Sequence, residues 1–247
     1  AGSAENDVFN GSAYVSGSGA TKVEITGNVN VEAVGALQAT ARIDAASYSV
    51  TALKIGVNMV SAATAARTSA YMSGLTQVNA GGDVTVNASN STYTADGSTK
   101  TAYAVTGSAN GANISFVDGA YNKLSASTQS EASAYAENVN VKADGNIGIT
   151  AKSVNSANAK VQDADLKASV SGIKLSATEV NADTSDAVKA YVTLNSSISG
   201  YDVLVEATTD SDALAEVMPP QVSVSGISGS GVKGTANSWY WLATAKS

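Results

Sequence analysis

The heptapeptide GDVTVNA at residues 82–88 decides the expected fold, because the same pattern returns three more times. The other copies are GNVNVEA at residues 27–33, GNIGITA at residues 145–151 and YDVLVEA at residues 201–207. Within residues 82–88, Val84, Val86 and Ala88 alternate with polar residues, which is the period of a strand with one buried and one solvated face. The sequence therefore predicts four related strands, each of which follows a turn.

Four Ala-Tyr pairs repeat with nearly the same period as these strands. Successive tyrosines, Tyr14, Tyr71, Tyr135 and Tyr191, lie 57, 64 and 56 residues apart, and successive strands lie 55, 63 and 56 residues apart. Two independent features that share one long period indicate a repeat architecture. The glycine spacing within each repeat predicts a further division into about two coils per repeat.

The composition favours a thin core. Only 14% of the 247 residues are charged, there are 2 Phe and 2 Trp, and no Pro precedes Pro219. Small inward side chains and a proline-free ladder suit stacked strands. The prediction is an all-β fold, a parallel β-helix (β-solenoid), with an antiparallel β-sandwich as the alternative. The expected core of the repeats consists of Val29, Val31, Val84, Val86, Ile147, Ile149, Val203 and Val205.

Glycines also predict corners and boundaries. The apolar positions change parity beside Gly56 and again beside Gly172, which indicates corners between strands because a slip of one residue inverts the faces. The expected organisation is an N-terminal lead-in or partial repeat at 1–19, solenoid repeats at 20–217, and a capping or truncated next-repeat segment at 218–247. Because the chain has no initiator Met and no apolar signal region, we expect a processed piece of a longer protein.

The composition also argues against several function classes. With no Cys and no His, the chain lacks disulfides, thiolate ligands and the commonest general base. A net charge of −7 argues against nucleic acid and anionic lipid as partners. The chain has no apolar run of the length that crosses a bilayer, so no direct membrane insertion is expected. We predict no catalytic residues, no cofactor and no metal, and therefore no enzyme.

Two segments carry a resemblance to a known group of proteins. AYMSGLTQVNAGGDVTVNA at residues 70–88 and AYAENVNVKADGNIGITA at residues 134–151 resemble the repeats of leukotoxin-type filamentous adhesins and haemagglutinin-like β-helical proteins of bacterial surfaces. The resemblance implies a right-handed parallel β-helix in a secreted or surface-anchored protein, exported by an autotransporter or two-partner route. It also implies a non-catalytic role in cell adhesion, as a structural stalk or binding region outside the cell or on its surface.

The function that the resemblance implies does not identify the binding partner. A protein or glycan on a host or neighbouring cell is the expected partner. The alternative is self-association into an extracellular filament or matrix, and a carbohydrate-active β-helix is a third hypothesis.

Aromatic residues are the candidate binding residues, each with a structural alternative. Tyr71 and Tyr135 could form an exposed line for sugar stacking, but packing against the core at a corner is favoured. Trp239 and Trp241 could contact a ligand, but a hydrophobic plug over a coil end is favoured.

Polar residues of the turns and acidic pairs have mainly structural interpretations. Asn28, Asp83, Asn146 and Asp202 are expected to bond nearby backbone N–H groups. Paired acids suggest calcium, although solvated turn acids are the favoured interpretation. These pairs are Asp163/Asp165, Asp183/Asp186 and Asp210/Asp212.

Overall fold

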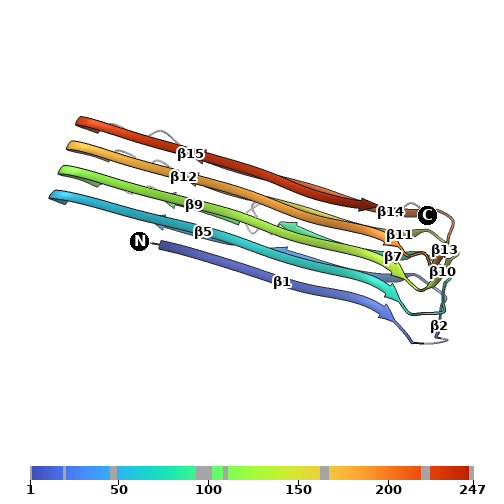
Figure 1. Ribbon diagram of the computed structural model, residues 1–247. Helices are drawn as coiled ribbons and strands as arrows, with labels where there is room; N and C mark the ends of the chain where they lie inside the picture. Colours follow the sequence, from blue (N-terminus) through green and yellow to red (C-terminus); the bar gives the residue numbers. More distant parts are fainter. Residues whose placement is uncertain are drawn as a thin grey trace.

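The chain folds into a β-solenoid of three parallel sheets (Figure 1). The structure is a computed structural model that describes residues 2–18, 21–44, 49–92, 102–107, 111–161, 167–217 and 223–244. Sheet A contains β1 (Gly2–Ser16), β5 (Ser49–Ser73), β9 (Gly111–Glu137), β12 (Lys167–Val192) and β15 (Ser223–Thr244). Sheet B contains β2 (Lys22–Ile25), β6 (Gln77–Ala80), β10 (Asn140–Ala143) and β13 (Ser197–Ser199). Sheet C contains β3 (Val29–Leu37), β4 (Ala39–Asp44), β7 (Val84–Thr92), β8 (Ala102–Gly107), β11 (Ile147–Val161) and β14 (Val203–Val217).

The solenoid predicted from the repeats is confirmed, and the antiparallel sandwich is excluded for the described residues, in which all strand pairs are parallel. The prediction of two coils per repeat is wrong. Each repeat contributes one strand to sheet A, and β5, β9 and β12 are 25, 27 and 26 residues long. A whole repeat therefore makes one long, flattened coil.

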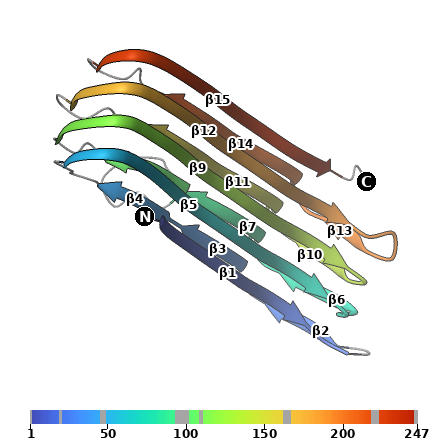
Figure 2. The ribbon, with the colours of Figure 1, turned by 60° about the vertical axis from the view of Figure 1, so that its left-hand side comes forward.

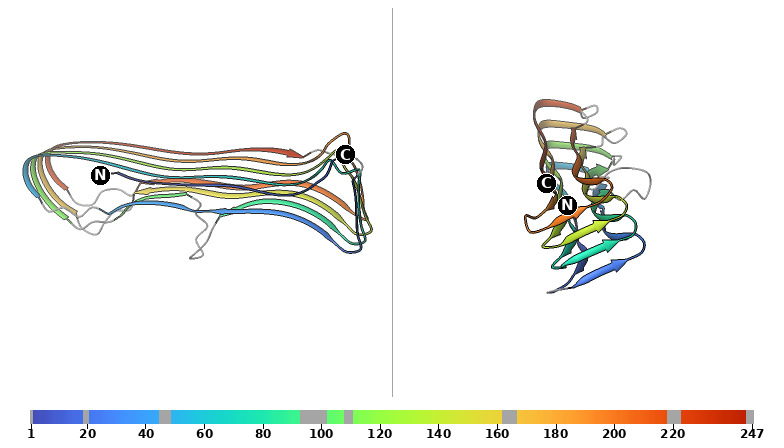
Figure 3. Two further views of the ribbon diagram at one scale, coloured as in Figure 1. Left: turned by 90° about the horizontal axis from the view of Figure 1, so that it is seen from below. Right: turned by 90° about the vertical axis from the view of Figure 1, so that its right-hand side faces the viewer.

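The cross-section of the coil is a narrow loop with two long sides. Figure 3 shows sheets A and C as the two long layers, with the short strands of sheet B across one end and a curl of the sheet A strands at the other. Figure 2 shows the strands of sheet C behind those of sheet A and running in the opposite direction. Inward side chains of the two long sheets pack together in buried apolar clusters, for example Val60 and Ala62 of sheet A with Ala39 and Ala41 of sheet C.

The register places the repeated heptapeptides directly above one another. Val84 pairs with Val29 on one side and with Ile147 on the other, and Ile147 pairs in turn with Val203. In the first three copies the two apolar residues of the heptapeptide are buried: Val29, Val31, Val84, Val86, Ile147 and Ile149.

The fourth copy departs from the expected burial. Val203 is 43% exposed, and Val205 is only partly buried. β14 pairs with β11 on one side, and no described strand of sheet C covers its other side. The side chains of this strand therefore have packing partners from one neighbouring coil only.

The expected corners at Gly56 and Gly172 are wrong, because β5 and β12 continue through both glycines. The strands bend instead of ending. The ladder between β5 and β9 omits Ala52 and Phe116, and the ladder between β9 and β12 omits Gly172. These omissions fall in the N-terminal parts of the sheet A strands, where the ribbons curl in Figure 3.

Turn residues between sheets B and C bond the next coil, as expected for Asn28 and Asp83. Asn28 Oδ1 accepts a hydrogen bond of 2.9 Å from the backbone N–H of Asp83, and Asp83 Oδ1 accepts one of 2.7 Å from that of Asn146. The prediction that these side chains satisfy backbone N–H groups is confirmed for both residues.

The expected terminal segments both contribute to sheet A. β1 comes from residues 1–19 and pairs with β5, and β15 comes from residues 218–247 and pairs with β12. Within the described residues, no helix is long and apolar enough to cross a membrane.

Candidate functional site

The outer face of sheet A presents rows of side chains that run along the solenoid axis. Because the strands are parallel and in register, each outward position recurs on every coil. One row contains Val8, Ala65, Gln129 and Ser185, the next Asn10, Arg67, Glu131 and Ala187, and a third Ser12, Ser69, Ser133 and Lys189. The fourth row contains the four tyrosines.

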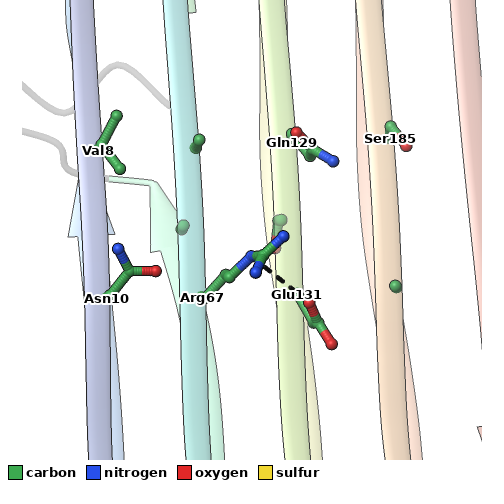
Figure 4. Close-up of a pocket in the computed structure, with 10 residues that line it drawn as sticks. Val8, Asn10, Arg67, Gln129, Glu131 and Ser185 are labelled. Carbon is green, nitrogen blue, oxygen red and sulfur yellow. Dashed lines mark ion pairs between the residues drawn. The ribbon is translucent and has the colours of Figure 1, made fainter.

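The first two rows form a shallow depression of about 320 Å³ (Figure 4). Ala65, Ser185 and Ala187 leave room in it because their side chains are small. Arg67 and Glu131 lie side by side, with Nε 3.6 Å from Oε2, and Lys189 Nζ lies 3.9 Å from the other carboxylate oxygen of Glu131. Exposed ion pairs of this kind add little to stability, so these charges are available to a ligand at low cost.

The four tyrosines form a continuous stack on the same face. Ring centroids lie 5.2 Å apart between Tyr14 and Tyr71, 4.9 Å between Tyr71 and Tyr135, and 5.0 Å between Tyr135 and Tyr191, and the rings are within 11° of parallel. Tyr14 is 57% exposed. The favoured interpretation, packing against the core, is wrong, because it is the alternating alanines beside the tyrosines that point inward.

Stacking determines which atoms of the tyrosines a ligand can reach. The ring faces of Tyr71 and Tyr135 are each covered by neighbouring rings on both sides. A sugar therefore cannot stack on these faces while the ladder is intact. The ladder offers ring edges and a row of hydroxyl groups spaced by one strand step, which suits hydrogen bonding to an extended ligand.

Burial within the ladder raises the pKa of Tyr135, and the adjacent Tyr191, Tyr71 and Glu137 raise it further. The pKa of Tyr191 is also raised, first by burial and then by Glu137. Both side chains thus keep the neutral hydroxyl, which can donate and accept a hydrogen bond, to higher pH than an isolated tyrosine does.

The two tryptophans lie in β15, the strand beside β12. The backbone of Trp239 pairs with Ser185, and that of Trp241 pairs with Ala187. Both therefore belong to the rows that pass through the depression. Their side chains lie outside the described part of the structure, so both interpretations of them stay hypotheses.

Among the described residues, no three acidic side chains are grouped as metal ligands would be. Asp163 and Asp165 lie outside the described residues. Asp183 faces outward on β12 and accepts a hydrogen bond of 2.8 Å from Asn237 Nδ2. Asp186 points into the interior, and Asp210 lies exposed within β14. The interpretation as solvated turn acids is therefore wrong for Asp186, which is buried in a strand.

A buried polar band crosses the interior between two apolar clusters, and sequence reasoning missed it. Its hydrogen bonds of 2.6–3.1 Å join sheets A and C and connect successive coils, except that the bond from Asn155 to Ser153 lies within β11. The bonded side chains are, in order along the axis, Thr68, Asn90, Ser130, Ser153, Asn155, Asp186 and Thr209.

Asp186 is the charged group of this band. It is 4% exposed, and it accepts hydrogen bonds from Asn155, Thr209 and Ser211. Burial raises the pKa of Asp186, and the hydrogen bonds from Ser211, Thr209, Asn155 and Ser153 oppose the rise. The carboxylate is enclosed by donors from β11 and β14, so the band connects sheet A to sheet C.

Comparison of the chain with protein-family models, curated proteins and solved structures finds no match. The geometry alone therefore supports the choice of candidate site. The depression and the tyrosine ladder share one face and offer hydroxyl, amide, guanidinium and carboxylate groups, a set suited to binding a polar extended ligand.

Proposed function

We propose that this protein is the stalk and binding region of an extracellular bacterial adhesin, with no catalytic role. One observation carries the proposal, namely that the tyrosine row places the same side chain at the same position on four successive coils of the outer face of sheet A. A regular row of this kind suits a polymeric partner such as a surface glycan, whose own units repeat.

The depression and the ladder are near enough to contact one ligand. Arg67 and Tyr71 are four residues apart on the same face of β5, which corresponds to about 13 Å along the strand. An oligosaccharide of a few units covers such a distance. In this proposal Arg67, Gln129 and Glu131 bond hydroxyl or acidic groups of the glycan, and the tyrosine hydroxyls bond the next units.

The solenoid supplies the stalk. Each coil rests on its neighbours through backbone ladders in three sheets, so its stiffness does not depend on a thick core. Secretion and a location on the cell surface belong to the same proposal, supported by the resemblance of residues 70–88 and 134–151 to filamentous adhesins.

The test is binding of the protein to panels of glycans and to fixed cells. The double variant Arg67→Ala, Glu131→Ala removes the ion pair at the depression with no change in net charge. The matched control is Lys152→Ala, Asp210→Ala, which removes one exposed charge of each sign from the outer face of sheet C.

We expect saturable binding that the first variant weakens at least tenfold and the control leaves unchanged. If both double variants bind as the unmodified protein does, the binding face lies elsewhere. If the unmodified protein binds no glycan and no cell surface, the adhesin proposal fails.

A further inference from the structure

A second patch on the outer face of sheet A exposes apolar side chains where the strands curl (Figure 3). It comprises Leu53, Ile55, Val57, Tyr121, Leu175 and Ile227, and we refer to it as the apolar face. Ile55 is 73% exposed and Leu175 is 56% exposed. Each side chain in such a state leaves on the order of 100 Å² accessible, so the six present roughly 600–700 Å², above the usual size of a patch on a monomer.

The apolar face has a regular surface relief, in which raised positions alternate with hollows. Register places Ile55, Gly119, Leu175 and Gly229 in one row, so that large side chains and glycines alternate from coil to coil. Gly119 lies on the floor of a depression of about 550 Å³, which Ile55 and Leu175 also line. The adjacent row is wholly aliphatic and contains Leu53, Val117, Ile173 and Ile227.

The fold itself does not require glycine at position 119. A Cβ added there would meet only Lys54 O at 3.7 Å and Ile55 Cγ1 at 3.8 Å, which are ordinary contact distances, and the residue does not have a positive φ. Glycine inside a strand weakens the strand and commonly marks a bulge, a tight bend or the close approach of a ligand or another backbone. Gly119 pairs regularly with Ile55 and Leu175, so it marks no bulge. Because no contact within the chain explains Gly119, the missing side chain points to a contact from outside.

We propose that the apolar face binds the same face of a second copy of this chain, forming a two-fold symmetric dimer. The relief is self-complementary. Ile55 and Leu175 are two strand steps apart, as are Gly119 and Gly229, so both spacings are about 9.6 Å. A copy related by a two-fold axis that runs across the row, so that the two rows are antiparallel, places Ile55 of each chain over Gly229 of the other and Leu175 over Gly119.

The size and rim of the face also fit a dimer. The apolar side chains alone approach the roughly 800 Å² that each partner contributes to an interface of standard size. Two rows beyond the row of Ile55, Lys123 and Lys233 lie on either side of Glu179. The Nζ–Oε distances to Glu179 are 4.0 Å from Lys123 and 3.7 Å from Lys233. Such a charge-paired border is the polar rim expected around an apolar centre.

The test is the molar mass of the protein in solution, measured by sedimentation at concentrations up to about 1 mM, where even a Kd of 1 mM is detected. Gly119→Val adds a side chain to the depression at a position where the Cβ meets only ordinary contact distances. The control Gly148→Val makes the same change on the outer face of sheet C, where an added Cβ has nothing within 4 Å.

We expect the unmodified protein and Gly148→Val to dimerise with the same Kd, and Gly119→Val to weaken the dimer at least tenfold. Gly119→Val should melt at the same or a higher temperature, because valine favours the strand. Ile55→Lys should also weaken the dimer and keep the secondary structure, since its side chain is exposed.

A protein that stays monomeric over the whole range overturns the proposal, as does a Gly119→Val variant that dimerises normally. Open-ended assembly beyond the dimer overturns the two-fold arrangement. The test is independent of glycan binding, because the Arg67→Ala, Glu131→Ala variant should dimerise as the unmodified protein does.

Discussion

Asn155 donates a hydrogen bond of 2.6 Å from Nδ2 to Oδ1 of Asp186, and this bond joins sheet C to sheet A inside the solenoid. The same amide group donates to Ser153 Oγ at 2.7 Å. Neutral donors stabilise a buried carboxylate less than water stabilises an exposed one. Burial is therefore the largest cause of the raised pKa of Asp186.

Asp186→Asn should stabilise the protein at neutral pH. Because the pKa of Asp186 is raised in the folded state, the stability that this group contributes is present below its unfolded pKa of about 4 and is lost as the pH rises through the folded value. The gain in melting temperature from the variant should therefore be largest at neutral pH and shrink towards pH 4. Asp183→Asn, on the outward side of the same strand, is the control. A lower melting temperature for Asp186→Asn at neutral pH would contradict this expectation.

Val86→Asp should destabilise the solenoid severely. Val86 is 1% exposed, so the change places an unpaired charge in the dry interior at a cost of about 3 kcal/mol or more. Thr85→Lys, one residue earlier on the outer side, should change the free energy of unfolding by less than about 0.5 kcal/mol. Chemical denaturation of both variants measures the difference. Equal effects at the two positions would mean that the assigned faces of β7 are wrong.

The titration of the tyrosines should include a component at a higher pH than the titration of free tyrosine. The pKa of Tyr135 is raised chiefly by burial, so the stability it contributes is present below the ordinary value of about 10 and is lost as the pH rises through the folded value. Phenolate absorbance of the native protein should show this late component, and Tyr135→Phe should reduce it while keeping the stack. If native and denatured protein titrate alike, the ladder does not shield its hydroxyl groups.

Gly74→Ala should cost about 1–3 kcal/mol of stability. Gly74 has φ of 67°, and an added Cβ would collide with the carbonyl oxygen of Gly17 at the corner between sheets A and B. Gly148→Ala has open space around it and should instead stabilise by about 0.5 kcal/mol. Thermal melting of the two variants should therefore shift in opposite directions.

Incubation with acidic and neutral glycans should release no new reducing ends. Glycoside cleavage needs two carboxyl groups that face one bond, whereas Glu131 in the depression is held by Arg67 and Lys189. New reducing ends that appear with the protein and disappear in a Glu131→Gln variant would establish an enzyme in place of a passive binder.

The fold was predictable because the sequence has two regular periods, the two-residue alternation within each strand and the long repeat that relates the strands. Alternation in residues 82–88 fixes which side of the strand is buried, and the long repeat fixes which strands are neighbours. Both inferences depend only on local residue type and spacing, and the register of Val84 with Val29 and Ile147 follows from them.

The number of coils was not predictable from the glycines. A change of parity beside Gly56 or Gly172 has the same sequence pattern whether the strand bends or ends, because glycine permits both. Continuous hydrogen bonding with the next coil decides the outcome, and that depends on the length of the facing strand.

The polar band and the tyrosine ladder left signals that could have been used. The inward phase of Val84, Val86 and Ala88 continues to Asn90, which places an amide inside the solenoid. Likewise Tyr71 stands between Ala70 and Met72, so its parity places it outside when these two are buried. The carboxylate of Asp186 is different, since its enclosure depends on side chains from two other strands, β11 and β14.

Because one repeat closes one complete turn, the molecule is modular along its length. Excising residues 84–146 would place Ile147 directly after Asp83, at the position that Val84 now occupies, and duplicating the same segment would add one more layer. Each such event would shorten or lengthen the rod by about 4.8 Å without changing any surviving neighbour pair. The reach of such a rod therefore changes in equal increments with the number of its repeats.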